Sequence, residues 1–196
     1  MKKNLLKDTI ADLEKYINRS SSDFKHRIKH FMKRYNNEFP IKSKIKERAI
    51  AESMIYILFR RSLFLYCFDL KGACVIDIHS LVERLLIEHV VRKVFKKEDD
   101  ISLKLVEKNS LPEIARMLEK LELLGKESVK YSEKLNRIRN AIAHRNPNII
   151  SKLFLGGKKI TSLDIDSAVD KVDCISLLFG AIYLIMDLAN NLQINK

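Results

Sequence analysis

Long apolar stretches with helical spacing and very few helix breakers constrain the fold of this chain more than any other feature. The 196 residues include only 5 Gly and 3 Pro. Between them, apolar residues recur three or four positions apart, as they do on the buried face of a helix. We therefore predict an all-α fold, and the chain is long enough for a sizeable core.

The turn residues between these stretches define the expected helices. They cover about 4–18, 23–36, 42–70, 73–96, 99–108, 110–125, 127–145 and 162–192. Gly72 and Gly125 are expected to end two of them, and Ser110 with Glu113 to form a capping box at the start of another. A two-residue-turn hairpin or an ordered loop is expected at 152–161, around a Gly-Gly pair.

A linker that ends in proline is expected at residues 36–40. Proline cannot continue a helix, and it keeps the preceding residue out of the helical region. The linker divides the chain into a basic helical N-terminal extension, residues 1–39, and a helical bundle domain, residues 40–196.

The formal net charge of +12 favours an anionic partner, nucleic acid first and an acidic protein or membrane surface second. The helix at 23–36 is strongly basic, and its Lys25, Lys29 and Lys33 recur every four residues. One interpretation is a surface that tracks phosphates. A solvated outer face and an amphipathic membrane helix are the alternatives.

Cysteine usage and hydropathy predict a cytoplasmic protein with no membrane span. The 3 cysteines form no CxxC pair and lie in apolar segments, as buried thiols do in a reducing compartment. The longest apolar run, residues 175–186, is shorter than the ~20 residues that a bilayer span requires. His26 and His30 lie one turn apart but have no third ligand beside them, so no metal or other cofactor is expected.

Side chains that could take part in catalysis lie close together at the C-terminal end of the helix at 127–145, just before Pro147. On a helical wheel, Arg137, Asn140 and His144 share the face opposite the apolar stripe. Arg139 lies about 100° from Asn140, where a long side chain still reaches round. A histidine beside guanidinium groups suits acid–base catalysis on a phosphodiester, whereas a solvated or C-capping histidine is the simpler interpretation.

A second polar pair interrupts the apolar arc of the helix at 73–96. His79 and Glu83 lie one turn apart there, and a carboxylate on a buried face is costly unless it is paired. A structural pair with His79 or with an arginine is one interpretation. The other is that Glu83 reaches the cluster of Arg139 and His144.

The segment Arg139-Asn140-Ala-Ile-Ala-His144 resembles the signature of the HEPN superfamily of helical nucleotide-binding and RNase domains. That signature is Arg, often followed by Asn, and then His after about four to six intervening residues. The order of the expected helices over residues 42–192 is similar as well, and the resemblance implies a HEPN-like antiparallel helical bundle. Residues 82–100 are also similar to the HEPN-like mannitol-operon-repressor group, which is associated with regulation rather than cleavage.

The resemblance implies a metal-independent endoribonuclease of a toxin or antiviral-defence type that leaves 2′,3′-cyclic phosphate ends. Two protomers would pair so that both Arg/His sets face one cleft. His144 would transfer the proton, and Arg139 would bind the phosphate. Asn140 would orient the imidazole or the phosphate, and Glu83 would be the supporting acidic residue from the neighbouring helix.

Further contacts to RNA are expected from Arg137 and Arg145, and an antitoxin or regulatory protein is an expected partner. On an undistorted helix Arg137, not Arg139, shares the face of His144, so either residue is a candidate to hold the phosphate. The alternative function is a non-catalytic module that binds nucleic acid or a protein, or regulates transcription.

Overall fold

Every regular element in the described part of the chain is a helix, which confirms the predicted all-α fold. The computed structural model describes residues 22–38, 53–90, 106, 108–158 and 164–194. In chain order the helices are α2 (Ser22–Glu38), α3 (Ser53–Cys67), α4 (Lys71–Val90), α6 (Leu111–Lys120), α7 (Lys126–Ala143), α8 (Pro147–Phe154), α9 (Asp164–Val169) and α10 (Cys174–Ile194). The helix predicted at 4–18, and most of the one at 99–108, lie outside the described residues.

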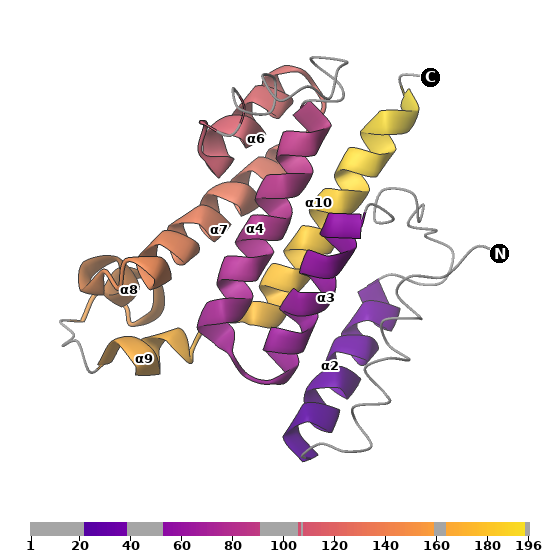
Figure 1. The fold of residues 1–196 in the computed structure, drawn as a ribbon. Helices are drawn as coiled ribbons and strands as arrows, with labels where there is room; N and C mark the ends of the chain where they lie inside the picture. The colour runs from indigo at the N-terminus through magenta and orange to yellow at the C-terminus, as the bar shows by residue number, and fades with distance from the viewer. Residues whose placement is uncertain (1–21, 39–52, 91–105, 107, 159–163, 195–196) are drawn as a thin grey trace.

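Helix α4 lies at the centre of the bundle, in contact with α3, α6, α7 and α10 (Figure 1). A short turn joins α3 to α4, so these two helices run antiparallel. Helices α6 and α7 pack on one side of α4, whereas α2 packs against α3 on the other (Figure 1). The small helices α8 and α9 extend from the C-terminal end of α7.

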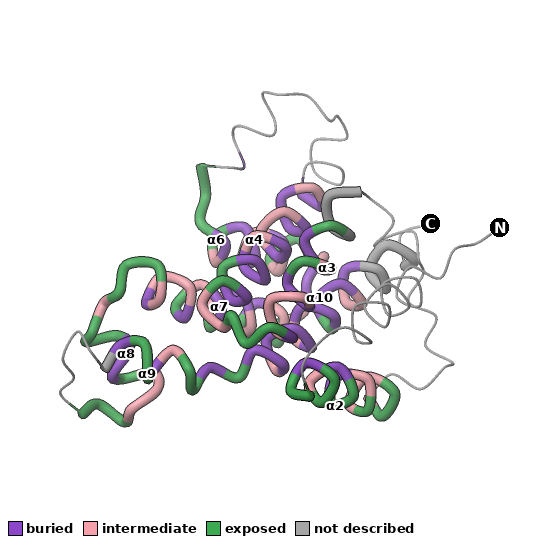
Figure 2. The backbone as a smooth tube through the Cα atoms, turned by 60° about the horizontal axis from the view of Figure 1, so that its bottom comes forward, coloured by how far each residue is buried: buried purple, intermediate pink, exposed green. Residues whose placement is uncertain are grey.

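One main core unites helices from both parts of the chain (Figure 2). Helix α2 contributes Phe24, Ile28 and Phe31 to it, on the apolar side that its spacing predicted. The largest fully buried side chains are Phe31, Phe179, Leu63, Ile78, Leu81, Leu86, Leu111, Ile114, Leu118, Leu135 and Ile150. All three cysteines are buried free thiols, as expected from their apolar surroundings.

The hairpin expected at 152–161 is wrong for the residues that the structure describes there. Residues 147–154 form helix α8, which Asn146 caps by accepting hydrogen bonds from the backbone N–H groups of Asn148 (3.1 Å) and Ile149 (3.2 Å). Pro147 occupies the first turn, where its missing N–H costs nothing. The apolar residues that suggested a strand, Leu153 among them, instead recur at helical spacing and pack against the core.

Two other predicted boundaries are also wrong. The helix expected at 162–192 is two helices, because Asp173 starts α10 afresh: its carboxylate accepts from the N–H (3.1 Å) and the hydroxyl (2.6 Å) of Ser176. Asn36 and Asn37, expected in a linker, belong to the last turn of α2.

Three helices end on non-glycine residues in the left-handed conformation, namely Asp69 (φ 60°), Glu122 (φ 57°) and Arg145 (φ 45°). Each follows a helix whose last turn is closed by a reverse pair of backbone hydrogen bonds. The expectation that Gly72 and Gly125 end helices is therefore wrong. Gly72 lies in the first turn of α4, and Gly125 is the N-cap of α7. The capping box at Ser110 and Glu113 is confirmed.

Candidate functional site

Helix α7 carries Arg137, Arg139 and Asn140, has His144 as its C-cap, and is fixed by α10 in its N-terminal half. At its start, the Asp187 carboxylate of α10 accepts from the Gly125 N–H (2.9 Å) and from the Ser128 hydroxyl (2.6 Å). In its second turn, the Tyr131 hydroxyl donates to the carbonyl of Leu177 on α10 (2.7 Å). Helix α7 is therefore held against α10 as well as against α4 and α6.

The C-terminal end of α7 forms a sharp corner with α8. His144 is the C-cap, and its backbone N–H donates to the Asn140 carbonyl (3.1 Å). The N–H of Asn146 then donates back to Ala141 (3.1 Å), and the N–H of Arg145 to Ile142 (3.2 Å). This double closure is the Schellman motif, so the corner and the His144 backbone are well defined.

The left-handed conformation of Arg145 gives a testable prediction about stability. Its exposed side chain pairs with Asp166 of α9 (3.2 Å), which contributes at most about 1 kcal/mol. In an Asp166→Asn background, Arg145→Gly is expected to raise the free energy of unfolding by about 1 kcal/mol, because glycine adopts this conformation without strain. Urea unfolding measures the effect, and Arg145→Ala is the control without the gain. A destabilised glycine variant would contradict the left-handed corner.

The structure joins the side chains of Arg139 and Asn140, whereas the imidazole of His144 is not bonded to either of them. The Arg139 Nη1 donates to the Asn140 Oδ1 (2.8 Å), so its side chain does reach round the helix. Both side chains are half-buried, whereas His144 and Arg137 are exposed. Among the described residues, no hydrogen bond joins the His144 imidazole to Arg139 or Asn140.

Glu83 is not on a buried face, contrary to expectation, since 38% of its side chain is exposed. No ion pair links it to Arg139 within the described residues. Its Oε2 lies 3.9 Å from the Nδ1 of His79, which is beyond hydrogen-bond distance. The contact supports the structural interpretation of Glu83, as a neighbour of His79, more than a direct role beside His144.

His79 is the buried polar residue at the interface of α4 and α7. Its Nε2 lies 3.1 Å from the Asn136 Oδ1, and because an amide oxygen can only accept, Nε2 carries the proton. Burial lowers the pKa of His79, and the nearby Arg139 charge lowers it further, against the opposing effects of Glu83 and of the Asn136 hydrogen bond. His79 is therefore neutral near pH 7, and its contact with Glu83 is not an ion pair.

This lowered pKa makes stability depend on pH with a definite sign. The unfolded chain binds a proton at His79 below about pH 6.5, whereas the folded chain resists protonation until a lower pH. The stabilising contribution is therefore complete above pH 6.5 and is lost as the pH falls below it. We expect the free energy of unfolding to drop more between pH 7.5 and 5.5 in the wild type than in His79→Gln. Urea titrations of both proteins at both pH values measure this, and equal drops would contradict it.

The remaining candidates lie on other faces. Lys25, Lys29 and Lys33 are exposed on α2, which packs against α3, whereas α7 packs against α4, α6 and α10 (Figure 1). The lysine row of α2 and the C-terminal end of α7 therefore lie on different sides of the molecule (Figure 1). Asn136, which contacts His79, was missed in the sequence, although its spacing from Arg139 and Asn140 puts it on the same flank of the helix.

Comparisons of the chain with protein-family models, curated proteins and solved structures gave no match. In the described part of the chain, none of the helices combines the length and the apolar character needed to cross a membrane. The chemical groups of the α7 corner are an exposed imidazole and, one turn earlier, a guanidinium bound to an amide oxygen.

Proposed function

We propose that the protein is a metal-independent endoribonuclease in which His144 and Arg139 act on the scissile phosphate. The observation that supports this most is the solvent-exposed imidazole of His144 at a well-defined helix end, one turn beyond the Arg139–Asn140 pair. The resemblance of this segment to the HEPN signature points to the same chemistry, as part of a toxin or an antiviral defence system.

The reaction is an internal transfer at phosphorus. His144 takes the proton from a ribose 2′-hydroxyl, the 2′-oxygen bonds to the adjacent phosphorus, and the bond from phosphorus to the 5′-oxygen breaks. The leaving 5′-oxygen receives a proton, which gives a 2′,3′-cyclic phosphate and a 5′-hydroxyl. The Arg139 guanidinium keeps N–H donors beyond the one that it gives to Asn140, and these would stabilise the charge on the phosphate oxygens.

A homodimer would supply a second imidazole, so that one His144 accepts a proton while its symmetry mate donates one. An exposed apolar side chain supports this proposal. Ile76 of α4 is 39% exposed, between two points where α4 meets α7: His79 beside Asn136, and Gly72 beside Ile142. Light scattering of the wild type and of Ile76→Glu tests the pairing, and a wild-type monomer at micromolar concentration would contradict the two-histidine mechanism.

The proposal is tested by incubating the protein with single-stranded or structured RNA in the presence of EDTA. We expect internal cleavage with 2′,3′-cyclic phosphate ends, and no cleavage where a 2′-deoxy nucleotide precedes the scissile bond. Cleavage of that deoxy substrate would contradict attack by the 2′-hydroxyl.

A non-catalytic nucleic-acid-binding function is the second candidate, and the exposed lysine row of α2 favours it. Lys25, Lys29 and Lys33 have no ion-pair partner among the described residues. This function predicts salt-dependent RNA binding without cleavage, abolished when the three lysines are replaced by glutamate.

A further inference from the structure

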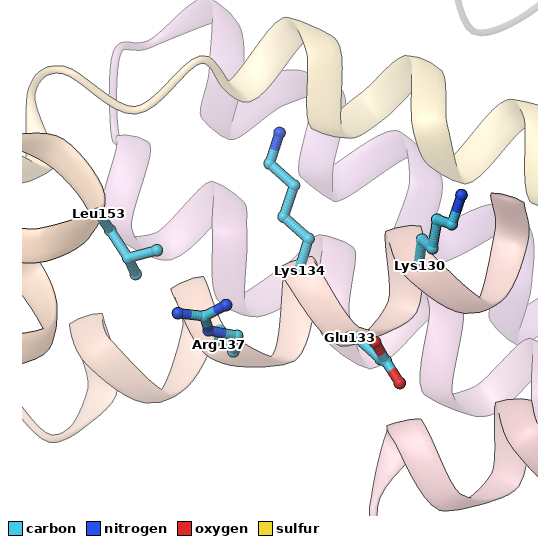
Figure 3. A pocket seen from close by; sticks show the side chains of 5 residues that line it. All are labelled: Lys130, Glu133, Lys134, Arg137 and Leu153. Atoms are coloured by element: carbon cyan, nitrogen blue, oxygen red, sulfur yellow. The ribbon is translucent and has the colours of Figure 1, made fainter.

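A basic recess lies along α7, beside α8 and away from the α2 lysines. Figure 3 shows the side chains that line it. They are Lys130, Glu133, Lys134, Arg137 and Leu153, around a volume of about 150 Å³. Four of them come from α7, and Leu153 of α8 forms an apolar wall.

Two of the three cations in the recess have no ion pair with any described residue. Lys130 pairs with Glu127 (2.7 Å), and the acid of the recess, Glu133, pairs with Arg116 of α6 (2.6 Å). Lys134 and Arg137 are both exposed and remain available. The charge of Lys134 also acts on the carboxylate of Asp173, just before α10.

The carboxylate of Asp173 is already engaged. Burial works to raise its pKa, but the hydrogen bonds from Ser176 and the charges of Arg34 and Lys134 outweigh burial and lower it. Asp173 thus stays ionised and bound to Ser176, and it offsets part of the Lys134 charge. The lining itself carries three cations and one carboxylate, so the recess still presents an excess of positive charge to solvent.

By helix geometry, the recess and His144 lie on nearly the same side of α7. Arg137 and His144 are seven residues apart, which places them on nearly the same side of the helix and about 10 Å apart along its axis. Helix α8 runs back beside this path, because Ile150 packs with Ala141 near the corner while Leu153 faces the recess farther along. A linear anion that lies in the recess and follows α7 would reach the end of the helix that carries His144.

We propose that this recess binds the RNA backbone, with Lys134 and Arg137 holding phosphates about three stacked nucleotides from the bond cut at His144. The inference rests on the proposed function for the identity of the strand and for the reaction at its end. Cations without ion pairs, arranged along a helix beside an apolar wall, suit a chain of evenly spaced phosphates. Single-stranded RNA is favoured over an acidic peptide, because the recess offers charge but only one apolar side chain.

The experiment measures binding of a short fluorescent single-stranded RNA by anisotropy, in a His144→Ala background that leaves the RNA intact. The test protein also carries Lys134→Gln and Arg137→Gln. The control carries Lys120→Gln and Lys158→Gln, which remove two exposed lysines outside the recess. We expect the test pair to weaken binding roughly fivefold to tenfold at low salt, and to lower the slope of log K against log salt by about 1.4, at ~0.7 per lost phosphate contact. The control pair loses the same net charge, so it should change the affinity and the salt slope only by the small amount that this loss of charge causes.

The outcomes separate this site from the proposed function. If the wild type cleaves RNA but the test pair binds it as the control does, the recess is not a binding site while the endoribonuclease proposal stands. If the wild type does not cleave RNA but the test pair loses binding, the reaction is wrong and the recess stands. An oligoglutamate peptide that binds as tightly as RNA through Lys134 and Arg137 would overturn the assignment to RNA.

Discussion

Replacing His144 with alanine is expected to lower the rate of RNA cleavage by about 10²- to 10⁴-fold, the usual contribution of general acid–base catalysis. The side chain is exposed and makes no hydrogen bond among the described residues, so the variant should keep its fold and its thermal stability. His26→Ala is the matched control, because His26 is exposed on α2, away from the α7 corner. Cleavage rates in EDTA for the three proteins decide the matter, and equal rates would exclude His144.

Substitutions of Arg139 test whether the phosphate is held by positive charge alone or also by the paired N–H donors of a guanidinium. Arg139→Ala should reduce cleavage about as strongly as loss of one oxyanion donor, roughly 10²- to 10³-fold. Arg139→Lys keeps the charge but loses the fork of parallel N–H donors, so it should recover only part of the activity. If Arg137→Ala has the larger effect instead, the phosphate is held on the face of Arg137, which the helical wheel left open.

Gly180→Ala is expected to be the most damaging of the glycine substitutions in this chain. Helix α10 approaches α7 so closely that a Cβ at Gly180 would lie 2.2 Å from the Tyr131 Cε2 and 2.5 Å from its Cδ2. The ring cannot simply rotate away, because its hydroxyl donates to Leu177 and burial holds its pKa high enough to keep that proton. We expect a loss of roughly 2–4 kcal/mol, from overpacking and a broken buried hydrogen bond.

Two comparisons isolate that steric cause. Gly72→Ala should be neutral or slightly stabilising, because its Cβ would meet Ile142 and Val169 at ordinary distances of 3.6 and 3.7 Å. In a Tyr131→Ala background, Gly180→Ala should no longer destabilise, because the ring is gone and alanine favours the helix. Urea unfolding of Gly180→Ala, of Tyr131→Ala and of the double variant measures the coupling between the two positions. A Gly180→Ala loss that persists without Tyr131 would contradict this explanation.

Elements marked by periodicity and by side-chain caps were predictable from the sequence. Helices α2 and α7 agree with prediction within two residues at each end, because an apolar stripe and a stop signal coincide there. The break before α10 was not recognised, since Asp173 caps a helix inside an otherwise continuous apolar pattern. The hairpin error arose because a short apolar run with glycines after it fits a strand and a helix equally well.

The candidate site was only partly predictable, for a different reason. The contact between Arg139 and Asn140 lies within one helix, so the spacing of the two residues was enough to indicate it. The burial of Glu83 was predicted wrongly because a helical wheel shows only which residues share a side of α4. The packing of α4 against α7 decides which part of that side stays exposed. The recess could not be foreseen, because Leu153 belongs to a helix that was not predicted. The left-handed conformation at Arg145 could not be predicted either, because the usual sequence signal for it, a glycine, is absent at that position.

The contribution of α10 to the main core has a consequence for how the chain folds as it is made. This helix supplies Leu178, Phe179, Ile182 and Ile185 to the main core, and it is the last of the described helices to leave the ribosome. A nascent chain that lacks it cannot close the core or hold the start of α7, which depends on Asp187. Because domains fold as units during synthesis, the bundle and its α7 corner would assemble only after translation has passed α10. Incomplete translation products would therefore carry the His144 segment without the framework that positions it.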